Sequence, residues 1–293
     1  MYGNLSTKFG EILSSLSSSD REVLMEVYTF SHHAHLDQKR KSGEDYFIHP
    51  LAVAINLHNK FGDLELTCAG LLHDTVEDNE TIHMNEIYNR FGYEVGYLVD
   101  SVTKNKQQYY GEDQIYERKI DKFLFGGIKS VKCYLLKLAD RDDNMKTIGN
   151  LKDFKQVRIA FETQAIFTPL ENILDYHNLS SIQEAEDNLK TFCKNNNITD
   201  YLELKDKLIS STYQNFSSDS FDSVYQNSNN VTWKITNREI LDDFLQIPEI
   251  DDKIEMISIN YGNISKFSYM FRFKKGEIMK SNIKLQIGDT YSF

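Results

Sequence analysis

The chain has 293 residues, 40% of them hydrophobic, which is enough to bury a sizeable core in one large domain or two modest ones. Its 33 basic and 44 acidic residues give a net charge of −11, which argues against a general binder of nucleic acid or of an anionic membrane. No run approaches the roughly 18 apolar residues of a membrane span, and no secretory signal begins the chain, so we expect a cytoplasmic protein. The three cysteines are widely spaced and predict neither a disulfide framework nor a thiolate zinc site.

Residues 5–35 have the pattern of two helices separated by a polar, serine-rich break. The second helix should begin near Asp20, whose side chain can cap it. We expect Val23, Leu24 and Val27 on its buried side.

A compact basic segment follows these helices in an otherwise acidic chain. Arg40 offers a planar fork for phosphate and Lys41 a point charge, and a Ser-Gly turn signal comes next. The segment alone is equally compatible with a solvated surface loop. His49 precedes Pro50, and proline is favourable at the first position of a helix, so we expect His49 at the entrance of a helix.

The stretch Leu66–Asn79 combines an apolar helical pattern with four titratable side chains. His73 and Glu77 are four residues apart, as are Asp74 and Asp78, so on one continuous helix both pairs would project the same way. Burying carboxylates with an imidazole is costly unless a cation compensates. The stretch is therefore typical of a divalent metal site, although a solvated helix end explains it equally well in isolation.

Further helices are expected along the rest of the N-terminal region. Residues 81–104 read as two short helices separated by Phe91 and Gly92. Another apolar helical run ends near Asp140, which shares a face with Asn144. Alone, Asp140 could be a metal ligand or a paired structural carboxylate. Pro169 marks a kink or a break in the last helical pattern.

Four motifs in this order are far more specific than any one of them. They are HxxQxRKSGExYxxHP at 35–50, LLHDTVEDNET at 71–81, FGYEVGYLVDSVTK at 91–104 and LKLADRDDNMKT at 136–147. Together they resemble the HD-superfamily hydrolase domain of the RelA/SpoT alarmone enzymes, over about residues 20–180. The resemblance implies a mainly α fold, an HD-superfamily helical bundle, that binds one manganese ion. It also implies removal of the 3′-pyrophosphate from (p)ppGpp, leaving GDP or GTP.

The resemblance assigns roles to residues that match the family's motifs. The implied metal ligands are His49, His73, Asp74 and Asp140. The implied catalytic pair, which positions or activates the attacking water, is Glu77 and Asp78. The residues implied to contact the nucleotide are Arg40, Lys41, Ser42, Asn144 and Thr147.

Some positions depart from the family's pattern. Asp142 and Asp143 replace the Leu and His of LADRLHNM and add two negative charges beside the pocket. Asp37 stands where Gly is common, Asp45 where the motif has Pro, and Lys146 where Arg is common. None of these changes removes a proposed ligand. They leave open whether the substrate is ppGpp, pppGpp or an adenosine analogue such as ppApp.

The last third of the chain does not resemble the synthetase domain of long family members, so we expect a hydrolase without synthetase activity. The expected domains are residues 1–180, the hydrolase; 181–230, helices and a polar linker; and 231–293, a small α+β accessory unit. That unit should hold strands near 231–235, 253–261 and 266–274, a helix between the first two, and a turn at Gly262 and Asn263. Alternating aromatic residues predict one buried face on its last strand. Regulation, homo-oligomerisation and binding of a protein partner are all open for it.

Two other functions compete with this one. The chain could be an HD phosphohydrolase for another phosphorylated nucleotide, or a catalytically decayed nucleotide-binding, antitoxin-like protein. All four candidate ligands and both Glu77 and Asp78 are present, which a sensor would not need. The pattern therefore favours an active enzyme with a small nucleotide substrate.

Overall fold

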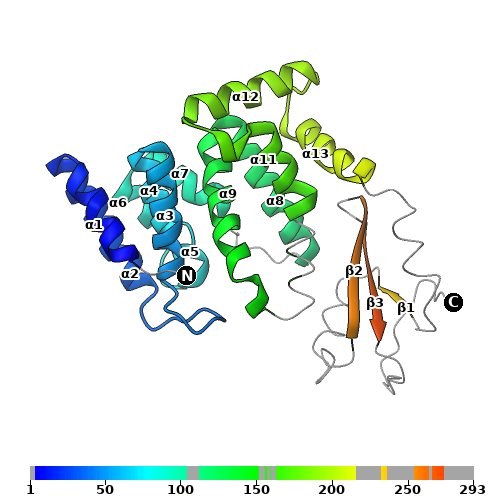
Figure 1. Ribbon diagram of the computed structural model, residues 1–293, viewed down its shortest axis with the longest axis horizontal. Coiled ribbons are helices and arrows are strands. Elements are labelled where there is room, and N and C mark those ends of the chain that lie inside the picture. Colours follow the sequence, from blue (N-terminus) through cyan, green and yellow to red (C-terminus); the bar gives the residue numbers. More distant parts are fainter. Residues whose placement is uncertain are drawn as a thin grey trace.

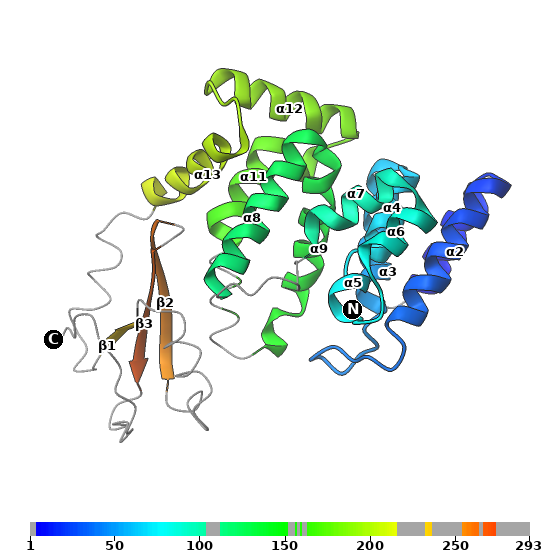
Figure 2. The ribbon, with the colours of Figure 1, turned by 180° about the vertical axis from the view of Figure 1, so that it is seen from behind.

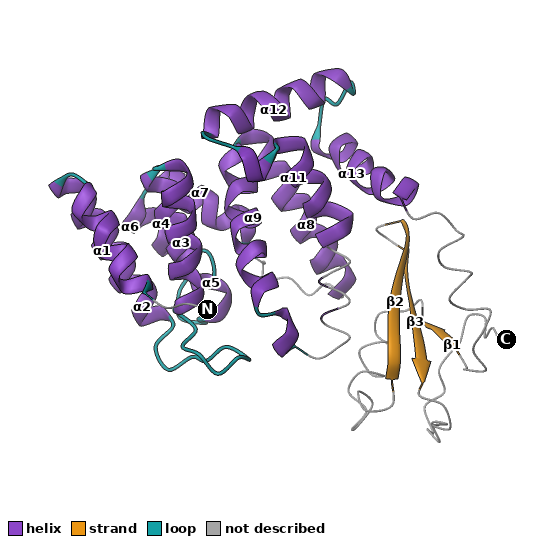
Figure 3. Cartoon of the chain, in the orientation of Figure 1, coloured by secondary structure: helices purple, strands orange, loops and turns teal. Residues whose placement is uncertain are grey.

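The computed structural model describes residues 4–103, 112–151, 156, 159, 163–215, 232–235, 254–263 and 266–273. Helices dominate this part of the chain (Figures 1 and 3), which confirms the predicted mainly α fold class. The helices are α1 (Leu5–Ser15), α2 (Ser18–Ala34), α3 (Ile48–Phe61), α4 (Leu64–Leu72), α5 (Thr75–Asp78), α6 (Met84–Phe91), α7 (Tyr93–Val102), α8 (Glu112–Lys129), α9 (Val131–Lys146), α11 (Thr168–Leu174), α12 (Ile182–Asn195) and α13 (Tyr201–Asn215). Short helical turns are η1 (Ile148–Asn150), η2 (Thr163–Phe167) and η3 (Tyr176–Asn178), and the strands are β1 (Thr232–Ile235), β2 (Ile254–Asn263) and β3 (Lys266–Phe273).

The first two helices differ in detail from the prediction. Ser17, rather than Asp20, caps α2, because its Oγ accepts a hydrogen bond from the Asp20 backbone N–H at 3.2 Å. Leu24 and Val27 are fully buried, as predicted. Val23 was expected beside them but is 47% exposed, because it lies one helical step away from the face that packs on the core.

Helices α3 and α4 form the centre of the bundle. Gly62 ends α3 in the left-handed region, with φ of 63°, and its N–H donates to the His58 carbonyl at 2.8 Å. Asp63 then caps α4 by accepting from the Leu66 N–H at 2.8 Å. Every residue of α4 from Leu66 to Leu72 is buried, so this helix is enclosed on all sides rather than along the single expected stripe.

The predicted continuous helix through residues 66–79 is wrong. Helix α4 ends at Leu72, His73 and Asp74 form a turn, and α5 begins at Thr75. Two hydroxyl groups supply donors for the last carbonyls of α4: Ser31 Oγ donates to Leu71 O, and Thr75 Oγ1 donates to Leu72 O at 2.7 Å. The four titratable residues therefore do not follow one helical periodicity.

Helices α1, α2, α6 and α7 lie on the same side of α9 as α3 and α4, and α8, α11, α12 and α13 lie on its other side (Figures 1 and 2). Helices α2, α3 and α7 pack on α4, and α9 packs on α3 and on α8. The predicted break at Phe91 and Gly92 separates α6 from α7, and Pro169 lies in the first turn of α11. In the described part of the chain, no helix has both the length and the apolar character needed to cross a membrane.

The helices that follow residue 180 share the core of the hydrolase region. Ala185 and Leu189 of α12 and Leu204 and Leu208 of α13 belong to the same hydrophobic cluster as α3 and α4. Ser181 caps α12 by accepting from the Glu184 N–H at 3.2 Å. The expected boundary at residue 180 thus falls between helices that pack on one another.

The three strands form one antiparallel sheet in the order β1-β3-β2. Gly262 and Asn263 belong to β2, where the register shifts between Tyr261 and Asn263, so the predicted turn at these two residues is wrong. The expected helix between β1 and β2 lies outside the described residues, as do the side chains that would form the buried face of β3.

Candidate metal centre

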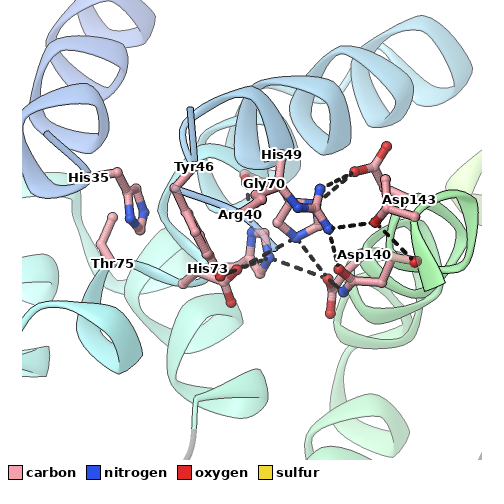
Figure 4. A network of polar contacts seen from close by, with 12 residues as sticks. His35, Arg40, Tyr46, His49, Gly70, His73, Thr75, Asp140 and Asp143 are labelled. Atoms are coloured by element: carbon pink, nitrogen blue, oxygen red, sulfur yellow. Dashed lines mark hydrogen bonds and ion pairs between the residues drawn. The ribbon is translucent and has the colours of Figure 1, made fainter. Parts of the chain in front are cut away.

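Four side chains implied as metal ligands converge between α3, the end of α4 and α9, and Figure 4 labels three of them, His49, His73 and Asp140. His49 Nε2 lies 3.1 Å from Asp140 Oδ1 and 3.5 Å from Asp74 Oδ2. His73 Nε2 lies 3.2 Å from Asp74 Oδ2 and 3.6 Å from Asp140 Oδ1. The ligand atoms of His49, His73 and Asp140 all lie within 4.8 Å of one another.

The surroundings of these atoms fit a divalent cation. His49, His73 and Asp140 are only 1%, 2% and 3% exposed. Both the imidazole nitrogens and the carboxylate oxygens are therefore removed from solvent. Within the described residues, His73 Nε2 lies near the carboxylates of Asp74 and Asp140 but makes no hydrogen bond of good geometry. A buried ring nitrogen without a hydrogen bond is costly, and a cation at this point would use its lone pair. We conclude that the group is suited to a divalent metal ion.

Each ligand is oriented by a second contact. His73 Nδ1 donates to the Gly70 carbonyl at 2.9 Å, which leaves Nε2 as the acceptor nitrogen of the neutral ring. His49 Nδ1 lies 2.7 Å from Asp143 Oδ2, so this contact also leaves the Nε2 of His49 facing the cluster. The Tyr46 hydroxyl donates to Asp74 Oδ2 at 3.0 Å.

Asp140 is held from its own helix. Lys137 Nζ donates to Asp140 Oδ2, and Asn144 Nδ2 donates to Asp140 Oδ1 at 2.5 Å. The predicted shared face of Asp140 and Asn144 is therefore confirmed. Lys137 also supplies a positive charge inside the cluster, which offsets part of the cost of burying carboxylates.

The buried charges polarise one another. Burial raises the pKa of Asp140, but Lys137 and the two histidines outweigh it and hold the pKa well below the ordinary value. Burial lowers the pKa of His73, yet Asp74 and Asp140 hold it well above the ordinary value. Without a metal ion, Asp140 is therefore ionised and His73 keeps its proton, and a bound divalent cation would take the place of that proton.

The basic segment is folded against α9. Gly43, with φ of 90°, closes a turn in which the Gly43 N–H donates to the Arg40 carbonyl at 2.9 Å. Arg40 donates through Nη2 to Asn144 Oδ1 at 2.9 Å and to Thr147 Oγ1 at 3.1 Å. Three of the five residues implied to contact the nucleotide are thus brought together.

The other two implied nucleotide contacts lie further along the same loop. Ser42 is half-buried and its hydroxyl donates to Glu44 Oε2 at 3.2 Å. Lys41 is exposed. Neither forms part of the contact between Arg40 and α9.

The implied catalytic pair lies on α5, beside the cluster of His49, His73, Asp74 and Asp140. Glu77 is half-buried and Asp78 is exposed. Burial and the neighbouring charge of Asp74 raise the pKa of Asp78, while the Tyr46 hydroxyl and His35 act in the opposite direction. The break after Leu72 turns both residues onto a separate short helix, which the continuous-helix prediction had not allowed.

Several residues that shape the site were not singled out from the sequence. Tyr46 and Lys137 lie three residues before His49 and Asp140, and Gly70 lies three residues before His73. Asp143, noted only as a departure from the motif, follows Asp140 by three residues. A search for polar or small residues at helical spacing from each ligand would have found all four.

Comparison with known proteins identifies the class of protein. A family model described as "HD domain" matches residues 27–176, which is more than half of the chain. The chain belongs to the HD-domain family.

Curated relatives indicate which members of the HD-domain family this chain resembles. A protein of Aquifex aeolicus named guanosine-3′,5′-bis(diphosphate) 3′-pyrophosphohydrolase is 40% identical over 167 residues, covering 57% of this chain and 23% of its own length. A Myxococcus xanthus protein named GTP pyrophosphokinase is 37% identical over 159 residues, covering 53% of this chain and 21% of its own. The chain thus spans less than a quarter of either relative, and the resemblance to RelA/SpoT-type enzymes is confirmed for its N-terminal part.

A solved structure was also found. It is described as a metazoan ortholog of SpoT that hydrolyzes ppGpp, and it has a TM-score of 0.44 and 21% identity. The match covers 63% of this chain and 99% of that structure.

Proposed function

We propose that the protein is a metal-dependent hydrolase that removes the 3′-pyrophosphate of (p)ppGpp, giving GDP or GTP. The observation that supports this most is the buried cluster of His49, His73, Asp74 and Asp140 beside a basic loop. A metal and a cationic loop are what an acidic protein needs to bind a polyphosphate. The nucleotide would be met in the cytoplasm.

The donor set supports a single hard or borderline divalent ion, and we propose manganese. Two imidazole nitrogens argue against calcium and magnesium, which prefer oxygen alone, and the choice of manganese follows the resemblance to the RelA/SpoT hydrolase domain. When bound, such an ion lowers the pKa of a water ligand and polarises the phosphorus that is attacked.

The chain's own residues supply the other parts of the reaction. Glu77, half-buried on α5 beside the cluster, accepts the proton of the attacking water, and Asp78 orients that water. Arg40 and the exposed Lys41 offset the negative charge of the phosphates. Asn144 and Thr147 fix the guanidinium of Arg40 and line the nucleotide pocket.

The two relatives' names describe different reactions, hydrolysis of a 3′-pyrophosphate and transfer of pyrophosphate to GTP. The GTP pyrophosphokinase is matched over only 21% of its length, so its name also describes parts that this chain does not match. The site itself favours hydrolysis, because buried histidines and carboxylates around a cation generate a nucleophilic water.

A nucleotide panel tests the proposal. Purified protein with manganese is incubated with ppGpp, pppGpp, ppApp and GTP, and released pyrophosphate and phosphate are measured separately. We expect pyrophosphate from ppGpp and pppGpp. Pyrophosphate from ppApp alone would change the base assignment, and release of single phosphates from GTP would point to another HD phosphohydrolase activity.

A further inference from the structure

A single buried carboxylate, Asp143, joins the metal cluster to the basic loop. It lies in the last turn of α9 and is 0% exposed. Its Oδ2 accepts from His49 Nδ1 at 2.7 Å and from Arg40 Nη1 at 3.2 Å (Figure 4). Lys146 Nζ lies 3.3 Å from its Oδ1. One side chain therefore contacts a metal ligand and a residue of the nucleotide loop through the same oxygen.

The contact with His49 fixes which ring nitrogen faces the metal. An ionised carboxylate can only accept hydrogen bonds, so Nδ1 of His49 must carry the hydrogen. The lone pair of the neutral ring is then on Nε2, the atom that lies near Asp140 and Asp74. A carboxylate in this position also makes the imidazole a better donor to a cation.

The contact with Arg40 fixes the loop. Arg40 is bonded to Asp143, Asn144 and Thr147, which are all on or next to the end of α9. The Arg40 side chain is only 10% exposed in this arrangement. Arg40 and His49 both bond to Asp143 Oδ2, so this single oxygen fixes the position of the Arg40 guanidinium relative to the His49 imidazole.

We propose that Asp143 is a positioning residue that couples the metal ligand His49 to the substrate-binding Arg40, an inference that rests on the proposed function. Removing it releases two groups together: His49 loses the acceptor that orients it, and Arg40 loses one of its anchors on α9. Metal affinity and substrate affinity should therefore both change. The neighbouring Asp142 serves as a control for the loss of one negative charge, because it interacts with His177, Lys146, Lys60 and Asp143 but makes no contact of its own with His49 or Arg40 among the contacts described here.

The first test needs no substrate. Manganese binding to the full chain is measured by titration calorimetry for the wild type, Asp143→Ala, Asp143→Asn and the control Asp142→Asn. We expect the dissociation constant to rise by about 10- to 100-fold in Asp143→Ala, the usual cost of losing a contact behind a metal ligand. Asp143→Asn keeps the shape and should give a smaller rise, and Asp142→Asn should bind as the wild type does.

Wild-type affinity for manganese in both Asp143 variants would overturn the role toward His49. If Asp143→Ala does not fold, circular dichroism will show it, and Asp143→Asn then carries the test. A wild-type protein that binds manganese but leaves ppGpp intact would contradict the proposed function while the binding comparison still stands.

The second test addresses the coupling to Arg40. KM and kcat for ppGpp are measured at saturating manganese for Arg40→Gln, Asp143→Asn and the double variant. If Asp143 acts through Arg40, both single variants raise KM, and the double variant is less impaired than the product of the single effects. Independent effects that multiply in the double variant would overturn the coupling.

Discussion

Each of the four side chains proposed as metal ligands is held in place by another group of the protein. A backbone carbonyl holds His73, a carboxylate holds His49, a phenol holds Asp74, and a lysine with an amide holds Asp140. Such outer contacts fix ligand geometry before a metal arrives, which reduces the cost of ordering the site on binding.

Substituting one proposed metal ligand and one proposed general base should separate metal binding from turnover. Asp74→Ala removes a carboxylate from the centre of the cluster, so we expect loss of both bound metal and activity. Glu77→Gln should retain the metal and lower kcat by about 10²- to 10⁴-fold, because only the proton acceptor is lost. Metal content by mass spectrometry and pyrophosphate release are the two measurements. Normal turnover by Glu77→Gln would show that its assigned role is wrong.

His35 should make the stability of the fold depend on pH. Burial lowers the pKa of His35. Its Nδ1 lies 2.9 Å from Gln38 Oε1, and its ring stacks on Tyr46. The folded state therefore binds a proton less readily than the unfolded state. The neutral ring's contribution is complete above the unfolded pKa of about 6.5 and is lost as pH falls toward the lower folded pKa.

The matching variant is His35→Leu, which does not titrate. Between about pH 8 and pH 5.5, the wild type should lose more free energy of unfolding than the variant, by up to about 1.4 kcal/mol for each pH unit below 6.5. Urea unfolding at both pH values measures the difference. An equal loss in the two proteins would show that His35 does not titrate on unfolding.

The candidate ligands could be predicted from the sequence because they lie in motifs with fixed spacing. Their partners could not, since a pattern of residue types does not say that Tyr46 reaches Asp74 or that Asp143 reaches His49 across 94 positions. These contacts depend on how α3, α4 and α9 meet. The sequence motifs therefore identify the candidate ligands, but the orientation of each ligand depends on contacts between distant parts of the chain.

At the scale of elements, the site depends on the close approach of α3 and α4. A Cβ on Gly70 would lie 2.9 Å from Ala54 Cα and 3.2 Å from Leu57 Cδ1. The Gly70 carbonyl also accepts from His73. The same glycine thus permits the helix contact and orients a ligand.

Gly70→Ala should lower both stability and metal affinity. Separating α3 from α4 costs about 1–3 kcal/mol in the free energy of unfolding, the range for overpacking a core. Gly10→Ala is the control, because a Cβ there meets nothing within 4 Å and alanine favours the helix by about 0.5–1 kcal/mol. Urea unfolding and manganese titration test both variants. Wild-type stability in Gly70→Ala would contradict the close contact.

The break between α4 and α5 shows why one element was mispredicted. The residues around His73 favour a continuous helix, and no Gly or Pro marks an end. The last carbonyls of α4 accept hydrogen bonds from the hydroxyl of Ser31, 40 residues earlier, and from the hydroxyl of Thr75. The contact with Ser31 is tertiary, and a local sequence pattern cannot reveal it. By contrast, Gly62 and Gly92 act locally, and the helices around them were predicted.

At the scale of the whole molecule, the described helices on both sides of residue 180 share one hydrophobic cluster. This cluster runs from Phe9 to Leu208 among the described residues. The candidate site residues all lie between Arg40 and Thr147. The helices after residue 180 support the region that holds the site.

A chain ending at Asn215 should therefore fold and hydrolyse ppGpp at close to the full-length rate. A chain ending at residue 180 should lose stability, because α12 and α13 contribute buried Leu189 and Leu204. Thermal unfolding and pyrophosphate release measure the two truncations. Folding without activity in the longer truncation would give residues 216–293 a part in catalysis.

The most direct test of the account is release of pyrophosphate from ppGpp by the purified protein, with manganese and then with a chelator. The buried His and Asp cluster predicts release with manganese, with GDP as the nucleotide product, and none after chelation. Release that persists in the chelator, or no release while manganese is demonstrably bound, would contradict a metal-dependent (p)ppGpp hydrolase.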